Sequence, residues 1–167
     1  MTDEERRIRS YLQAQGAKLS PAEVIDKVRA AMADLRRAAS SVPPARFEER
    51  PEPEEWSGNE VMAHVIATGR YFGDQIIAVI EGRPRAGGPR DTAPVPHRSA
   101  EEWWRILERD REALFDRVQT ADPQANLSAS IEHRMFGALT WRETLLFMRL
   151  HDLDHANQLQ KITAALA

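Results

Sequence analysis

The chain has 167 residues, 42% of them hydrophobic and 29% charged, with a formal net charge of −3; this suits one globular domain and gives no reason to expect nucleic acid or an anionic membrane surface as a partner. It contains no cysteine, which excludes disulfides, cysteine-ligated zinc and a cysteine nucleophile. No apolar run approaches the length of a membrane span and the first residues lack a signal-peptide core, so we expect a cytoplasmic protein without a membrane segment.

An N-terminal extension over residues 1–19 is expected to hold a short amphipathic helix between Thr2 and Gln15, with Gly16 as its stop. Four long helices follow, because a serine or threonine with a glutamate three residues later recurs as a capping box. The pattern occurs at Ser20–Glu23, Ser57–Glu60, Ser99–Glu102 and Thr140–Glu143. The sequence therefore predicts a single all-α domain, whose core over residues 20–165 contains helices at about 20–41, 57–81, 99–119 and 140–162.

The helix predicted for residues 57–81 carries a histidine beside its apolar stripe. His64 shares this flank with Thr68, Tyr71 and Gln75. A polar edge next to an apolar stripe is typical of a helix that lines a partly wet crevice between helices. The alternative is a boundary histidine that is hydrogen-bonded to a neighbouring carboxylate.

The connection over residues 82–98 is rich in glycine, proline and arginine, so no regular element is expected there. Its four arginines could receive a carboxylate or phosphate of a substrate, or they could be solvated charges on a surface loop. They are Arg83, Arg85, Arg90 and Arg98. We assign no role to His97.

The helix predicted for residues 99–119 places Asp110 among apolar residues of its core stripe. A carboxylate there needs a partner, which is either an arginine or a group near a metal site. After this helix, Asp122 and Pro123 open a loop that is expected to continue to the last helix.

The last helix carries His151 and His155, which project from successive turns of one face. Such a pair can bind one metal ion or can consist of boundary residues with satisfied hydrogen bonds. Leu146, Leu150 and Leu153 lie roughly opposite, so either the N-terminal helix or a second subunit must cover them. The latter would give a homodimer.

Three imidazoles on two facing helices could converge in the core of a bundle, and three nitrogen ligands with an open position are typical of a catalytic site. The segments WSGNEVMAHVIA and FGALTWRETLLFMRLHDLDHANQLQKI, in this order and at this separation, resemble those of the DinB-like superfamily, which includes the YfiT-like proteins. The resemblance implies a four-helix bundle with up-down-down-up connectivity. It also implies a divalent metal ion held by His64, His151 and His155. Members with known activity include transferases and isomerases that use bacillithiol or mycothiol.

Three functions are consistent with these features. The leading hypothesis is a transferase that activates a low-molecular-weight thiol on zinc or nickel for attack on a small-molecule substrate, with Asp152 and Asp154 orienting the imidazoles and Tyr71 and Gln75 lining the pocket. The second is a metal-dependent hydrolase of small molecules, in which Asp152 occupies the place of the general base in a zincin motif. The third is a non-catalytic ligand- or partner-binding bundle, in which Asp110 blocks the open coordination position.

Overall fold

The computed structural model describes residues 1–85, 87 and 94–167. In this part of the chain, five α-helices are joined by loops, a short 3-10 turn and one β-hairpin. In chain order these are α1 (Asp3–Lys18), α2 (Pro21–Ser41), η1 (Pro44–Arg46), α3 (Gly58–Ile80), α4 (Ala100–Thr120), β1 (Ile131–His133), β2 (Gly137–Leu139) and α5 (Trp141–Ala165). None of the described helices combines the length and the apolar content needed to cross a bilayer.

All four predicted capping boxes are formed, with Ser20, Ser57, Ser99 and Thr140 as the N-cap residues of α2, α3, α4 and α5. In each box the hydroxyl accepts a hydrogen bond from the N–H of the glutamate, whose carboxylate accepts one from the N–H of the cap residue. These reciprocal bonds satisfy two donors that a helix start would leave unpaired. They fix the residue at which each helix begins, and with it the direction in which the later side chains of the helix point.

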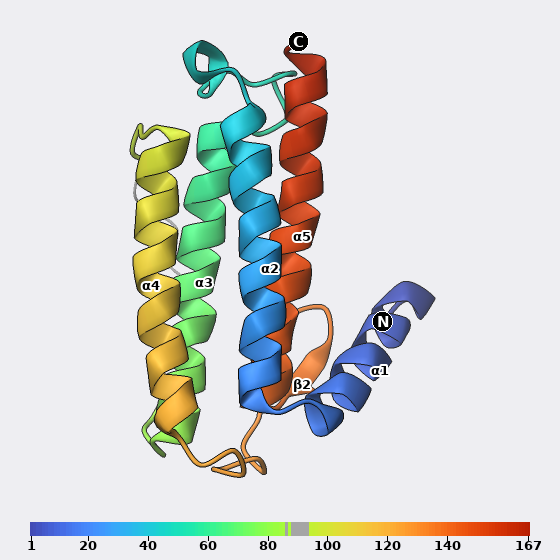
Figure 1. The fold of residues 1–167 in the computed structure, drawn as a ribbon. Helices are drawn as coiled ribbons and strands as arrows, with labels where there is room; N and C mark the ends of the chain where they lie inside the picture. Colours follow the sequence, from blue (N-terminus) through green and yellow to red (C-terminus); the bar gives the residue numbers. More distant parts are fainter. Residues whose placement is uncertain (86, 88–93) are drawn as a thin grey trace.

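The four long helices form an up-down-down-up bundle, as predicted (Figure 1). Helices α3 and α4 run in the same direction, so the end of α3 and the start of α4 lie at opposite ends of the bundle (Figure 1). Helix α5 packs most extensively on α2 and also contacts α3 and α1. Two of the four core helices, α2 and α3, thus lie directly against the helix that carries two of the three histidines.

Helix α1 lies outside the bundle, at an angle to it, against the lower part of α5 (Figure 1). It continues to Lys18, so the prediction that Gly16 ends it is wrong. Gly16 is buried in the helix, and a Cβ atom added there would lie 2.8 Å from Cγ of Glu143 on α5. The glycine allows a close approach of the two helices, which is a packing role.

The N-terminal helix covers part of the second apolar side of α5. Leu146 is fully buried, and Leu150 borders hollows that are also lined by Ile8 of α1. Arg149 of α5 donates a hydrogen bond to the hydroxyl of Tyr11, at 3.2 Å. Helix α1 thus provides one of the two coverings that we expected; a homodimer stays a prediction.

A β-hairpin between α4 and α5 was not predicted; a continuous loop was expected there. Strands β1 and β2 pair antiparallel, with Ile131 opposite Leu139 and His133 opposite Gly137. Each strand has only three residues, which is too short for an alternating pattern to stand out in a sequence. Gly137 has a φ of +72°, a value that glycine adopts without strain. The hairpin turns the buried ring of His133 into the molecule.

Candidate metal centre

Two facing helices bring together the three histidines that were expected to bind a metal. His64 lies two turns into α3, and His151 and His155 lie in the middle of α5. His155 is buried, and the other two are partly buried. The four-residue spacing on α5 keeps its two imidazoles on one face, and the packing of α3 on α5 supplies the third.

The distances between the ring nitrogens fit a single metal ion. Nε2 of His151 lies 3.3 Å from Nε2 of His64 and 3.1 Å from Nε2 of His155. All three ligand atoms lie within 4.8 Å of one another. Two nitrogens that each bind a tetrahedral ion at about 2.0–2.1 Å are about 3.3 Å apart. The donor set and its spacing therefore suit a divalent transition metal.

The protonation of two of the imidazoles also favours ligation. Nδ1 of His155 lies 2.7 Å from Oε1 of Gln158; because a carbonyl oxygen can only accept, Nδ1 is the donor, and this bond favours the tautomer whose lone pair is on Nε2. Burial, together with the neighbouring His155 and His64, lowers the pKa of His151 to about 2. His151 is thus in the neutral form that binds metals.

A cavity of about 960 Å³ opens beside the three histidines. Its walls come from α1, α3, the hairpin and α5. The lining is largely apolar. Its aromatic and aliphatic side chains include Tyr71, Phe72, Phe136, Phe147 and Leu150. A metal ion held by the three histidines would thus have protein ligands from α3 and α5, and space for a small molecule on the cavity side.

The candidate pocket residues have different positions. Tyr71 and Asp154 line the cavity, as expected for pocket residues. Gln75 is only 5% exposed and is not among the lining residues; its role at the pocket stays a prediction. It lies one turn beyond Tyr71 on α3, and its side chain is buried in the bundle.

Asp152 does not face the imidazoles. Its carboxylate accepts two hydrogen bonds from the guanidinium of Arg111 on α4, at 2.7 and 2.9 Å. Both side chains are almost completely buried. The expected roles of Asp152, in orienting the imidazoles or as a general base, are therefore wrong: its position on α5 is rotated from the histidine face toward α4.

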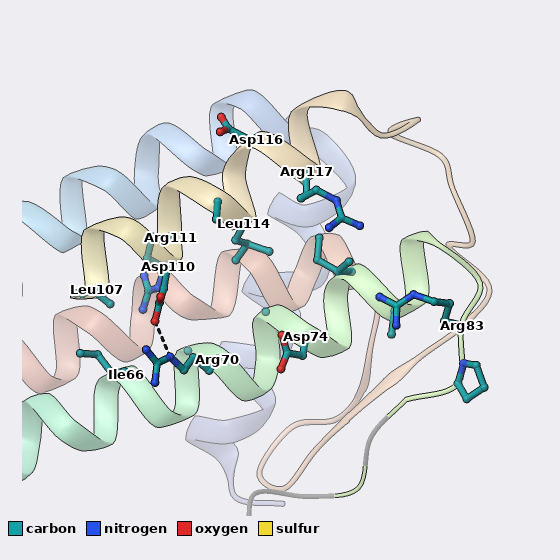
Figure 2. A pocket seen from close by; sticks show the side chains of 16 residues that line it. Ile66, Arg70, Asp74, Arg83, Leu107, Asp110, Arg111, Leu114, Asp116 and Arg117 are labelled. Carbon is teal, nitrogen blue, oxygen red and sulfur yellow. Dashed lines mark hydrogen bonds and ion pairs between the residues drawn. The ribbon is translucent and has the colours of Figure 1, made fainter. Parts of the chain in front are cut away.

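Asp110 has the arginine partner that was one of its two expected alternatives. Arg70 of α3 donates to its carboxylate at 2.6 Å, across a hollow of about 910 Å³ between α3 and α4 (Figure 2). None of the three candidate metal ligands lines this hollow. Asp110 therefore does not block the open coordination position.

The arginines of the long connection do not gather at the cavity. Arg83 donates to Glu81 at 2.6 Å, and Arg98 stacks over Trp103 with 5.3 Å between the guanidinium carbon and the ring centre. Arg85 is exposed. Arg90 lies outside the described residues. Among the described arginines of this connection, none lines the cavity beside the histidines.

Three residues at the site escaped the sequence analysis. Gln158 holds the tautomer of His155, Trp56 places its ring 4.9 Å from that of His64, and His133 lines the cavity from the hairpin. The position of Gln158, three residues after His155, was a signal that could have been used, because such a pair meets on a helix. Trp56 and His133 lie in irregular or very short segments, where sequence periodicity gives no orientation.

Comparisons with known proteins agree with this architecture. The model of the DinB superfamily matches residues 8–159. The chain is similar to the crystal structure of TT2238, described as a four-helix bundle protein, with 25% identity and a TM-score of 0.59 over 85% of this chain and 99% of that one. No protein of curated function matches. The family match spans both helices that carry the histidines, and the chain belongs to the DinB superfamily.

Proposed function

We propose that the protein is a metal-dependent transferase that activates a low-molecular-weight thiol, such as bacillithiol or mycothiol, at the three-histidine centre. Zinc and nickel are the divalent ions that we expect there. The observation that carries the proposal is the convergence of three Nε2 atoms at the wall of a largely apolar cavity. A structural metal site has its coordination closed by protein, whereas this one faces space for a substrate.

When bound, a divalent ion would lower the pKa of a thiol at its open position and so supply a thiolate at neutral pH. The chain itself contributes orientation and a dry environment. Gln158 keeps the lone pair of His155 on Nε2, and the ring of Phe147, 5.7 Å from that of His151, borders the centre on its apolar side. Such a wall would keep water from competing with the thiol for the electrophile.

The alternatives gain less support. A hydrolase with the zincin arrangement needs a free carboxylate at Asp152, and this carboxylate is engaged by Arg111. A non-catalytic bundle with a closed site needs a fourth protein ligand, and Asp110, the candidate for that role, is paired with Arg70. Hydrolysis of a small molecule by another arrangement is separated from thiol transfer by the thiol dependence of turnover.

The first test is the metal content of protein purified without an affinity tag or chelator. We expect about one equivalent of a transition metal in the wild type, and its loss in both His64→Ala and His151→Ala. His97→Ala is the matched control, because His97 is exposed and pairs with Glu48 at 3.0 Å. Absence of metal from the wild type, even after incubation with zinc or nickel, would overturn the proposal.

The second test separates the thiol from water as the nucleophile. Metal-loaded protein is incubated with a reactive epoxide or aryl halide, with and without bacillithiol or mycothiol. We expect consumption of thiol and electrophile in equal amounts, dependent on the metal. Turnover that proceeds equally well without thiol would identify a hydrolase instead.

A further inference from the structure

His133 is a fourth histidine in this cavity, in addition to the three candidate metal ligands. It lies on β1, is 8% exposed and lines the cavity together with the three candidate metal ligands. It does not belong to the group of residues whose ligand atoms could hold the metal. Its role must therefore come from its own hydrogen bonds and surroundings.

The backbone of the hairpin fixes the tautomer of this ring. Nδ1 accepts hydrogen bonds from the N–H groups of Met135, at 3.1 Å, and Phe136, at 3.3 Å. Because both backbone groups can only donate, Nδ1 carries no proton, and the proton of the neutral ring is on Nε2. Burial lowers the pKa of His133, which agrees with a neutral ring. The ring thus presents one N–H donor.

This donor has no acceptor in the described part of the chain, where the side-chain hydrogen bonds of His133 both involve Nδ1. Nε2 is not sealed in the core either: among the described residues, Arg142 Nε is the fully enclosed side-chain nitrogen or oxygen that lacks a partner. A buried ring whose N–H reaches a cavity without a protein acceptor is suited to bind an acceptor on a ligand.

Three phenyl rings hold the imidazole in place. It stacks on Phe72 and Phe136, with interplanar angles of 13° and 21°, and meets the edge of Phe147 at 4.3 Å between ring centres. The ring of Phe147 is in turn 5.7 Å from that of His151. Phe147 thus contacts both His133 and His151, and the two histidines line one cavity, so a single small molecule could reach both the donor and the metal centre.

We propose that the Nε2–H of His133 binds an uncharged acceptor oxygen of the substrate, of the carbonyl type, while the adjoining part of the substrate packs on Phe72 and Phe147. The proposal rests on the proposed function, because it takes this cavity as the active site. It makes His133 a substrate-binding residue that selects for an oxygen at a fixed distance from the metal centre.

Two substitutions distinguish the effect of the Nε2–H donor from that of the hydrogen bonds that Nδ1 accepts from the hairpin backbone. In His133→Asn, the amide oxygen can replace Nδ1 as acceptor for the hairpin, but the side chain is too short to replace Nε2. In His133→Gln, the amide nitrogen reaches the place of Nε2, but the acceptor for the hairpin is lost. His97→Asn, the same change at an exposed histidine that does not line the cavity, is the matched control.

The probes are 4-mercaptoacetophenone and 4-ethylthiophenol, two thiols that differ in the carbonyl oxygen. Their dissociation constants for zinc-loaded protein are measured by titration calorimetry, beside the zinc content and the melting temperature. We expect the wild type and His97→Asn to bind the carbonyl compound about three- to tenfold more tightly, as one hydrogen bond allows. In His133→Asn this preference should fall to near one, with the zinc content unchanged.

An unchanged preference in His133→Asn, or no preference in the wild type, would overturn the proposal. If the asparagine variant loses zinc or melts much earlier, His133→Gln decides, because retention of the preference supports the proposal and its loss contradicts it. Failure of both thiols to bind would count against the proposed function alone. The role of His133 would then be decided by the same ratio for 4-acetylbenzohydroxamate and 4-ethylbenzohydroxamate, which need only the metal.

Discussion

Replacement of Asp152 by asparagine should destabilise the protein strongly while leaving the metal ligands in place. Arg111 and Asp152 have side chains that are 3% and 0% exposed, and they share two hydrogen bonds. The substitution leaves the guanidinium of Arg111 buried without a counter-charge. Removal of one member of such a pair costs about 3–5 kcal/mol, a large share of the roughly 5–15 kcal/mol that stabilises a typical domain.

The assay is equilibrium unfolding in urea, followed by helical circular dichroism. With a slope of about 2 kcal/mol per molar, the midpoint should fall by about 2 M. Arg111→Met should cost a similar amount. The double variant Asp152→Leu/Arg111→Met should be more stable than either single variant, because no unpaired charge is left in the core. Asp154→Asn, at an exposed neighbour, should change the unfolding free energy by less than about 0.5 kcal/mol.

An Asp152→Asn variant that loses less than about 1 kcal/mol of stability would show that the buried ion pair is not a major source of stability. If that variant also kept its metal and lost all turnover, the carboxylate would have to act in the chemistry, and the hydrolase hypothesis would regain its general base. The two outcomes differ in stability and in activity, so the experiment separates a structural ion pair from a catalytic group.

Three further predictions follow from the contacts of α3 and α5. Gln158→Leu should weaken metal binding about 10-fold, measured by competition with a chelator, because the tautomer of His155 is no longer fixed; unchanged affinity would contradict this role. The hydrogen bonds from Arg50 hold the pKa of Glu60 below its ordinary 4.5, so Glu60→Gln should cost about 1 kcal/mol at neutral pH. That difference should disappear as the pH falls through the lowered pKa, and a difference that persists in acid would exclude an electrostatic origin. Asn59→Leu removes a buried side chain that bonds Pro96 O, Arg98 N and Trp103 Nε1, and should lower the unfolding free energy by about 2 kcal/mol; a smaller loss than in a matched surface substitution would contradict this.

The helices could be predicted because their starts are encoded locally. Each capping box lies within four residues of sequence, and the apolar stripes that follow have the helical period. The same regularity fixes the relative direction of His151 and His155 on α5. The position of His64, the third candidate ligand, could not be predicted from a local pattern, because it depends on the packing of α3 on α5. The family resemblance supplied this information.

The errors lie where orientation depends on a distant partner. Asp152 and Asp154 stand on opposite sides of the histidine face of α5, and the sequence treats them alike. The position of α4 decides the matter, because Arg111 meets Asp152, whereas Asp154 lies at the edge of the cavity. The hairpin and the position of His133 were not predicted for a different reason. Two hydrogen bonds from the backbone and three aromatic neighbours hold the His133 ring, and none of these contacts produces a periodic pattern in the sequence.

The pairing of α2 with α5 bears on how the chain is made. These two helices form the most extensive contact between elements, yet more than a hundred residues separate their starts. Contacts between segments so far apart form slowly, and during translation they cannot form until the later segment has been synthesised. The parts of α2 and α3 that pack on α5 therefore stay uncovered until α5 has been synthesised, so completion of the core and of the three-histidine centre must wait for this last helix.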